Sequence, residues 1–390
     1  MSISDSRQKR ADHRSAVDHL AALLTTGSLP AEGLQDDEWS AVVDLALQQD
    51  VAPALYGCLK DAGASLPQSV EAPLRQSHRA NVARNMRLFH ELAVILGAFQ
   101  QAGVSVVPFK GAQLTRAVYP DIGCRTMADL DLWIQRSEIE HARRIMQSLG
   151  YARVARSDRP AALQDALLGE TQMVKVGAPL VELHWNIFPG EWVRHTARVD
   201  ESAVWARATP LDGPLVRELS PEDAVIHLCV HLAVNHQLSG LGLRTLVDLN
   251  HARRAWSIDW GIVAQRAARW RVSCATWVVL RALGELLGDP GGALPLRRLA
   301  PGPGRRRVIA HMAGARQIAQ GMTLSAGPRR FVFLSLIVDR PTDAVRLVWR
   351  AVCPDRRWLA LRYDEPDAGW LGAWRLRARH IARIARTGNP

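Results

Sequence analysis

The sequence predicts an α+β protein in which a small α/β block lies between two helical regions. Apolar residues recur at three- and four-residue steps before residue 103 and again after residue 216, which is typical of amphipathic helices. Between these regions, the segment DLDLWI at 129–134 alternates between polar and apolar residues, as a half-buried strand does. The length of 390 residues favours two or three domains over one.

The helical N-terminal region is expected to span residues 16–103. The charged residues 1–15 precede it and are predicted to be loose. The segment 70–102 has the pattern of one long amphipathic helix. Gly103 is expected to end this helix, because glycine adopts the backbone conformation that closes a helix.

The α/β block is expected to span residues 104–215. Short apolar runs of β-type residues, separated by turn residues and by one helical pattern, define it. The expected elements, in chain order, are a strand at 104–110, a helix at 111–119, a loop at 120–127, a strand at 129–134, a helix at 137–149 and strands at 151–154, 171–176 and 180–188.

A second helical region is expected at 216–390. Ser220-Pro221 is typical of a helix start, with proline in the first turn. The segment 289–305 is rich in Pro, Gly and Arg, which predicts a surface loop. The basic stretch Trp374–Arg386 is expected to form a docked C-terminal helix, with contact to a membrane surface as the alternative. Further helices are expected at 243–254, 259–287 and 306–320.

The composition limits the classes of partner. The formal net charge of +11 indicates anionic partners such as nucleotides. Nucleic acid is not favoured, because no recognition motif accompanies the charge. The five cysteines form no C-x-x-C pair, which argues against a zinc ribbon or a disulfide framework and fits a reducing cytoplasm. The N-terminus lacks the apolar segment of a signal peptide, and no apolar run is long enough to span a bilayer.

Two carboxylates in the predicted strand at 129–134 indicate a metal site. Asp129 and Asp131 share one face of the strand, because alternate side chains point the same way. Two such carboxylates repel each other unless a cation lies between them. Mg²⁺ prefers oxygen ligands and accompanies substrate phosphates, so a site for one or two Mg²⁺ ions is predicted. A solvated face of an edge strand is the alternative.

Lys110-Gly111 lies at a predicted strand-to-helix turn. Glycine lets the backbone approach a phosphate, a helix N-terminus offers free N–H groups, and lysine adds a mobile charge. Lysine is rare in this chain, which favours a phosphate-binding turn. An ordinary strand end is the alternative.

The segment VELH at 181–184 is a second alternating strand. Glu182 and His184 share one of its faces. Glu182 is predicted to be a third carboxylate of the site, which holds a metal ion or accepts the proton of an attacking hydroxyl. His184 is expected to be structural and hydrogen-bonded beneath the site.

Three histidines in the second helical region invite a zinc interpretation. His227 and His231 are four residues apart and share a helix face. No glutamate follows His227, so the H-E-x-x-H signature is absent. We therefore expect His227, His231 and His236 to be buried and paired to the backbone or to Asp248.

Several motifs in sequence order resemble one family. FKGAQL (109–114), Tyr119, RTMADLDLWI (125–134), SLGY (148–151) and VELHW (181–185) together resemble the uncharacterised bacterial nucleotidyltransferase family of the polymerase-β-like superfamily. The later stretches HLCVHLAVNH (227–236), LRTLVDL (243–249) and CPDRRWLALRY (353–363) also look like it. The resemblance covers about residues 40–365, and the joint pattern is more specific than D-x-D alone.

The resemblance implies a mixed sheet that carries D-x-D in a nucleotidyltransferase-like core. It implies Mg²⁺ held by Asp129 and Asp131, with Glu182 as the third carboxylate. Lys110 and Gly111 occupy the turn where relatives carry Gly-Ser or Gly-Gly, which is a departure in the mode of triphosphate binding. Arg125 is expected to contact the triphosphate or to orient a catalytic aspartate, with a loop salt bridge as the alternative.

The implied activity is transfer of an NMP from an NTP, such as ATP, onto a hydroxyl or similar group. The acceptor is left open between a small molecule, a peptide and a saccharide. Two alternatives remain. One is a catalytically idle protein of a biosynthetic cluster that binds a nucleotide or a partner. The other is a kinase-like enzyme that transfers the γ-phosphoryl group.

Overall fold

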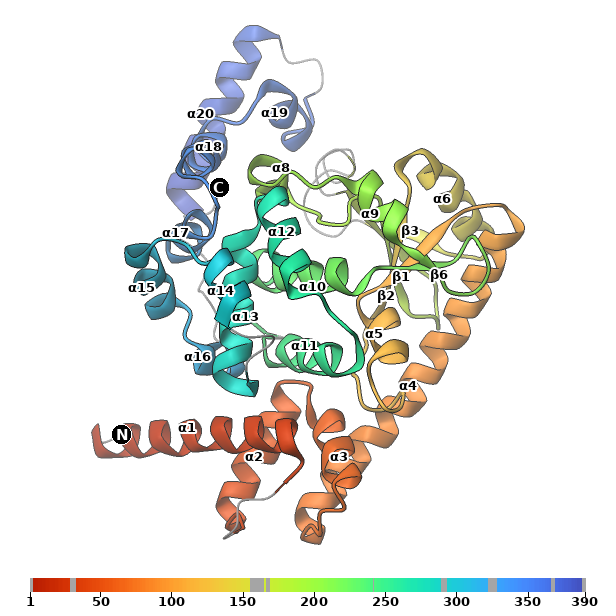
Figure 1. Cartoon of the computed structure of the whole chain (residues 1–390). Helices are drawn as coiled ribbons and strands as arrows, with labels where there is room; N and C mark the ends of the chain where they lie inside the picture. The colour runs from red at the N-terminus through yellow and green to blue at the C-terminus, as the bar shows by residue number, and fades with distance from the viewer. Residues whose placement is uncertain are drawn as a thin grey trace.

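A five-stranded sheet lies between helices from both ends of the chain (Figure 1). The computed structural model describes residues 3–28, 33–154, 165, 169–240, 242–288, 293–321, 328–365 and 369–387. The strands lie in the spatial order β1-β2-β5-β4-β3. Their bounds are β1 Val106–Phe109, β2 Asp129–Ile134, β3 Ala152–Val154, β4 Glu170–Val174 and β5 Leu180–His184.

The sheet is mixed, as predicted. β2 and β5 are parallel, whereas the β1–β2, β3–β4 and β4–β5 pairs are antiparallel. Leu130 and Leu132 of β2 and Val181 and Leu183 of β5 are buried in a core with α4 (Gln68–Gln101) and α6 (Ile139–Ser148). The intervening residues of β2 and β5 therefore point to the opposite face. That face carries the polar side chains of both strands.

The described residues of the N-terminal region form four helices. Their bounds are α1 Ile3–Thr26, α2 Asp36–Gln48, α3 Ala52–Asp61 and α4 Gln68–Gln101. The prediction of a long helix at 70–102 is confirmed, and Gly103 ends it with a φ of 73°. Residues 3–15, which the sequence predicted to be loose, belong to α1. These residues contain no proline or glycine, and the helix continues into side chains buried at Leu20 and Leu24.

Short elements connect the sheet to the C-terminal helices. The first of them, α5 (Gly111–Ala117), follows β1, and a 3₁₀ turn at Arg136–Glu138 precedes α6. Ser220 caps α10 by accepting a hydrogen bond from the Asp223 amide, as the Ser-Pro start predicted. The others are α8 Glu191–Thr196, α9 Glu201–Arg207, β6 Thr209–Pro210, β7 Arg217–Glu218, α10 Pro221–Val230 and a π-helical turn at His231–Asn235.

The C-terminal region differs from the prediction at three places. The expected helix at 259–287 is two helices, because Arg271 adopts a left-handed conformation between them. The expected helix at 306–320 is also divided, at Ala313 and Gly314. The predicted loop at 289–305 contains a helix of seven residues. The bounds are α11 Gly242–Ala255, α12 Trp260–Trp270, α13 Ser273–Leu287, α14 Ala293–Leu299, α15 Pro303–Met312, α16 Ala315–Ala319, α17 Pro328–Leu336, α18 Pro341–Val352, α19 Arg356–Arg362 and α20 Trp370–Thr387.

Helices from both ends of the chain share one core. In Figure 1, α1–α3 lie at the opposite end of the molecule from α18–α20, with α10–α13 between them. α1 nevertheless contacts α13 and α16, and one cluster of buried side chains extends from Ala16 to Leu347. The division into regions at 16–103, 104–215 and 216–390 follows the changes of element type and stays a prediction of folding units.

One face of the C-terminal helix α20 packs against other helices, and another face exposes apolar side chains. Ala373, Leu376 and His380 are buried, and α20 packs against α18 and α19. Trp370 and Trp374 remain more than half exposed, at 71% and 54%. In the part of the chain that the structure describes, no helix is long and apolar enough to cross a membrane.

Candidate functional site

The strand register brings two of the predicted carboxylates together. Asp131 of β2 pairs with Phe109 of β1 on one side and with Glu182 of β5 on the other. Glu182 in turn pairs with Gln172 of β4. Cross-strand partners share a face of a sheet. Asp131, Glu182 and Gln172 therefore form one polar row, and Asp129 lies two residues before Asp131 on the same face.

Hydrogen bonds and close contacts join these side chains into a buried cluster. Oδ1 of Asp131 accepts hydrogen bonds from Nζ of Lys110 at 2.7 Å and from Nε2 of His184 at 2.9 Å. Nε2 of His184 also lies 3.5 Å from Oε2 of Glu182, and Gln172 donates to Oε1 of Glu182 at 2.8 Å. The donor atoms of Asp131, Glu182 and His184 all lie within 4.8 Å of one another. Asp131 and Glu182, together with the partly buried Asp129 two residues before Asp131, are called the carboxylate cluster below.

The carboxylate cluster is electrostatically divided. Burial alone would raise the pKa of Asp131, but the Lys110 ammonium and His184 outweigh it and hold this pKa well below its usual range. At Glu182, burial raises the pKa and the hydrogen bond with His184 lowers it. The pKa of Glu182 is lowered on balance. At Asp129, burial and the charges of Asp131 and Glu182 raise the pKa to about 6. Asp129 is therefore the carboxylate with the least compensated charge.

The donor set of the carboxylate cluster fits a divalent cation. Its carboxylate oxygens are the ligand type that Mg²⁺ prefers, and Asp131 and Glu182 are both buried, at 4% and 6% exposure. Buried carboxylates that repel one another are stabilised by a cation between them. His184 bonds Asp131 and lies 3.5 Å from Glu182, so its nitrogen belongs to the same group of possible metal ligands.

Lys110 has an unusual backbone conformation. It precedes α5 with a φ of 50° and a ψ of −120°, in a region that residues with a side chain rarely adopt. Such a conformation costs about 1–3 kcal/mol and persists only where the surroundings fix it. Here the ion pair with Asp131 and a position 5.3 Å from the centre of the Phe109 ring hold the side chain over the site.

Arg125 does not lie free in the site. Its guanidinium donates two hydrogen bonds to Asp248 of α11, at 2.8 and 2.9 Å. Tyr119 donates a third hydrogen bond to Asp248 at 2.7 Å. The side chain of Arg125 is 7% exposed and that of Asp248 is 1% exposed. Arg125 therefore forms a salt bridge, which was the alternative prediction. This salt bridge is buried and joins regions that are distant in the sequence.

Gly111 makes room for this salt bridge. A Cβ atom at Gly111 would lie 2.7 Å from Nη1 of Arg125 and 3.0 Å from Sδ of Met127. These distances are shorter than van der Waals contact. The glycine at this turn is therefore explained by the close approach of Arg125, and α5 behind it has only seven residues.

Two polar residues and one arginine of the site were not predicted from the sequence. Gln172 bonds Glu182, and Oε2 of Glu170 lies 3.3 Å from Nδ1 of His184. The alternation of ETQMV at 170–174 is the signal that places both on the polar face. Arg244 of α11 is the third, because its charge acts on Asp129. No local pattern connects α11 to β2.

The three histidines of the second helical region form a chain of ring contacts. His227 lies 5.0 Å from Phe109 and 5.7 Å from His231, and His231 lies 4.5 Å from His236, measured between ring centroids. Burial lowers the pKa values of His227 and His231 well below the usual range. The expected pairing of a histidine with Asp248 is replaced by the bonds from Arg125 and Tyr119 to that carboxylate.

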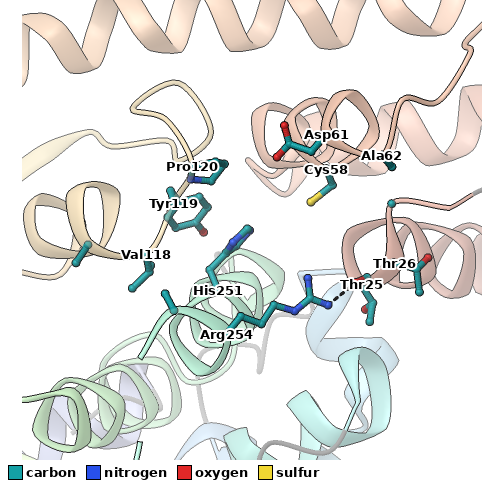
Figure 2. A pocket seen from close by; sticks show the side chains of 13 residues that line it. Thr25, Thr26, Cys58, Asp61, Ala62, Val118, Tyr119, Pro120, His251 and Arg254 are labelled. Atoms are coloured by element: carbon teal, nitrogen blue, oxygen red, sulfur yellow. Dashed lines mark hydrogen bonds between the residues drawn. The ribbon is translucent and has the colours of Figure 1, made fainter. Parts of the chain in front are cut away.

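Two larger cavities lie away from the carboxylate cluster. One, of about 620 Å³, is bounded by the ends of α1 and α3, the segment after α5 and α11 (Figure 2). His251 and Arg254 project into this space from α11, with Tyr119 opposite (Figure 2). The other, of about 680 Å³, lies along α4 between Met86 and Gln100. Neither of these two cavities is lined by the carboxylate cluster. Tyr119, which lines the first cavity, donates a hydrogen bond to Asp248, the partner of Arg125.

Comparison with known protein families gives the class of the chain. The model of a family described as uncharacterised nucleotidyltransferase matches residues 35–288. This is more than half of the chain, so the chain belongs to that family and is a nucleotidyltransferase. No curated protein matches it.

One solved structure is similar at a distance. It is the solution structure of antibiotic-resistance factor ANT(2'')-Ia, at 15% identity and a TM-score of 0.31. The match covers 48% of this chain and 91% of that chain.

Proposed function

We propose that the chain transfers an NMP from an NTP onto an acceptor hydroxyl or similar group, with Mg²⁺ held by Asp129, Asp131 and Glu182. The observation that carries this proposal is the pairing of Asp131 with Glu182 across the parallel strands β2 and β5, beneath which His184 is fully buried. Bound Mg²⁺ would neutralise charge on the triphosphate and on the leaving pyrophosphate.

In this proposal the protein positions and neutralises the reactants. Asp131 and Glu182, oriented by His184 and Gln172, hold the metal. Lys110 pairs with Asp131 and would be free to pair with the phosphates if Mg²⁺ were bound at Asp131. The acceptor proton passes to Glu182. Attack on the α-phosphorus then releases pyrophosphate, and positioning supplies most of the acceleration.

We further propose that Arg244, and not Arg125, contacts the triphosphate. Arg125 uses its guanidinium on Asp248 and on the Thr126 carbonyl. Arg244 lies 3.7 Å from Asp50 across a partly exposed ion pair, which is a weak contact that a phosphate can replace. In this arrangement Gly111 leaves space for the Arg125 side chain and does not contact a phosphate.

A second candidate function is a catalytically idle protein that binds a nucleotide or a partner. The ion pair between Lys110 and Asp131, at 2.7 Å, favours it, because a lysine that stays on Asp131 would exclude the metal. For the transfer reaction, the proposed acceptor is a small molecule, a peptide or a saccharide.

The first test is nucleotide binding by thermal shift, with each NTP, with and without Mg²⁺. A ligand that binds only the folded state raises the melting temperature. We expect a Mg²⁺-dependent rise with one or more NTPs in the wild type and none in Asp129→Asn/Asp131→Asn. The exposed carboxylate Asp44, on α2, provides the control Asp44→Asn, which should behave as the wild type. A rise that does not require Mg²⁺ and survives in the double variant supports the idle protein.

The bond that is broken is tested with labelled ATP, or with whichever NTP binds. An α-label transferred to an acceptor, with release of pyrophosphate, supports nucleotidyl transfer. A γ-label on the acceptor, with release of NDP, supports the phosphoryl-transfer alternative and overturns the proposal.

A further inference from the structure

A second group of metal-ligating side chains lies where α4 contacts the loop that leads to β2. His78 of α4 and Asp121 and Cys124 of the loop bring a nitrogen, a carboxylate oxygen and a sulfur within 4.8 Å of one another. These residues are separate from the carboxylate cluster. Nitrogen, oxygen and sulfur together are the donor set of zinc sites in proteins.

We propose that His78, Asp121 and Cys124 bind Zn²⁺ and that this ion fixes the loop against α4. A tetrahedral zinc with ordinary bond lengths separates nitrogen and oxygen ligands by about 3.3 Å, and oxygen and sulfur ligands by about 3.5 Å. Oδ2 of Asp121 lies 3.3 Å from Nε2 of His78 and 3.5 Å from Sγ of Cys124. Two edges of the tetrahedron are therefore already formed by this oxygen.

Two glycines leave room for the donor atoms. A Cβ at Gly57 of α3 would lie 2.6 Å from Sγ of Cys124. A Cβ at Gly123 would lie 2.5 Å from Nε2 of His78. Any other residue at either position would displace a donor. The two glycines therefore leave space for the His78 imidazole and the Cys124 sulfur in their observed positions.

The loop backbone is held in place by the same face of α4. Asn81 donates to the Gly123 carbonyl at 2.7 Å and Asn85 donates to the Arg125 carbonyl at 2.8 Å. The Gly123 amide donates to Oδ1 of Asp121 at 2.6 Å, and Nε2 of His78 lies 3.0 Å from the same oxygen, so the carboxylate is held toward the imidazole. Such bonds to a ligand raise metal affinity by fixing its direction.

The exposure of the group suits a site with three protein ligands and one water. The side chain of Asp121 is 48% exposed and that of His78 is 14% exposed, whereas Cys124 is 2% exposed. The solvent side at Asp121 leaves a fourth position for water. A cysteine protease-like role is excluded, because Asp121 lies between the other two residues and burial raises the pKa of the Cys124 thiol.

Binding of zinc at this site releases one proton, from the Cys124 thiol. The thiol proton of Cys124, now donated to Oδ2 of Asp121 at 3.5 Å, leaves to solvent, and neutral His78 binds through Nε2 with its proton on Nδ1. The ion would join α4 to the segment that carries Arg125 and then Asp129. Its effect is structural, so this inference does not rest on the proposed transfer reaction.

The test uses the full chain, stripped of metal with a chelator and then freed of the chelator. Zn²⁺ is titrated in competition with a chromogenic chelator, with excess Mg²⁺ present. Co²⁺ is titrated separately, because cobalt bound to a thiolate shows a charge-transfer absorption. We expect one equivalent of metal, the cobalt–thiolate absorption, and a higher melting temperature with Zn²⁺. Cys124→Ser and His78→Gln should each lower zinc affinity more than about 100-fold, beyond the loss from an outer partner.

Matched controls separate this site from others. His90→Gln on the same helix and Cys353→Ser should bind zinc as the wild type does, and so should Asp131→Asn, which removes a ligand of the carboxylate cluster. Far-ultraviolet circular dichroism verifies the fold of each variant. If Cys124→Ser fails to fold, Gly123→Ala, which displaces His78, replaces it. Zinc binding of equal strength in Cys124→Ser or Gly123→Ala, or no stoichiometric binding by the wild type, overturns the proposal.

Discussion

Asp131 and Asp248 are both buried aspartates that face a cation, yet their surroundings differ. Asp248 accepts two hydrogen bonds from Arg125 and one from Tyr119, which occupy both of its oxygens. Among the described residues, Asp131 accepts hydrogen bonds from Lys110 and His184 through Oδ1 alone. A carboxylate with both oxygens bonded serves the scaffold, whereas one with an oxygen left over can bind a ligand. The two residues should therefore respond differently to the same substitution.

The largest effect is expected on the activity of Asp131→Asn. Loss of a metal ligand should lower the rate of nucleotidyl transfer at least about 1000-fold, which is about 4 kcal/mol of transition-state stabilisation. The change in unfolding free energy should be smaller, because the amide still accepts from Lys110 and His184. Pyrophosphate release and urea unfolding measure the two quantities. An activity within tenfold of the wild type would remove Asp131 from the catalytic site.

Asp248→Asn should show the opposite pattern. It leaves the buried Arg125 guanidinium without a counter-charge, which costs about 3 kcal/mol of unfolding free energy. Urea unfolding at neutral pH measures the loss. The double variant Arg125→Met/Asp248→Leu should recover most of it, because an apolar pair of similar volume needs no counter-charge. If the double variant is as unstable as the single one, the ion pair is not the cause.

Glu201 extends the comparison to a carboxylate with no ion pair to a cation among the described residues. Burial raises its pKa to about 7 from the ordinary 4.5, against a hydrogen bond from the Ile187 amide. The protonated acid is therefore favoured in the folded state. Its contribution to stability is full below pH 4.5 and is lost as the pH rises through 7.

This pH dependence is measurable against Glu201→Gln. Between pH 4.5 and 7.5 the wild type should lose about 2 kcal/mol of unfolding free energy relative to the variant, after allowance for partial exposure of the side chain. Urea unfolding across this range, on both proteins, gives the difference. Parallel pH profiles would show that Glu201 has an ordinary pKa in the folded protein. The exposed Glu140→Gln is the matched control and should leave the profile unchanged.

The sequence predicted those parts of the site that a local pattern encodes. Alternation in DLDLWI and VELHW placed Asp129, Asp131, Glu182 and His184 on strand faces, because a strand repeats every two residues. The family resemblance added the expectation that the two strands share a sheet. The register that pairs Asp131 with Glu182 follows from strand order, which the sequence does not state.

Contacts between distant segments could not be predicted in the same way. Arg125 and Asp248 are 123 residues apart, and no periodicity connects them. The break at Arg271 carries no glycine signal, since an arginine there adopts a φ of 59°. The Pro- and Gly-rich composition of 289–305 likewise concealed helix α14 (Ala293–Leu299), because composition describes a whole window and not its interior. The proximity of His78 and Cys124 could not be predicted for the same reason as that of Arg125 and Asp248.

The smallest expected effect is that of Gly111→Ala. This variant tests whether the Lys110-Gly111 turn supports the site at Asp131 or the salt bridge at Asp248. Gly111→Ala places a Cβ 2.7 Å from Nη1 of Arg125, and Arg125 cannot retreat while Asp248 holds it. We expect a loss of about 1 kcal/mol, since overpacking costs about 1–3 kcal/mol and the better helix propensity of alanine offsets part of it. In an Asp248→Asn background the guanidinium is freer to move, so the same substitution should cost less, and urea unfolding of the four proteins measures this coupling. A Gly111→Ala variant with unchanged stability but a raised KM for the NTP would contradict this expectation, because the glycine would then serve the phosphates beside Asp131 and not the scaffold around Asp248.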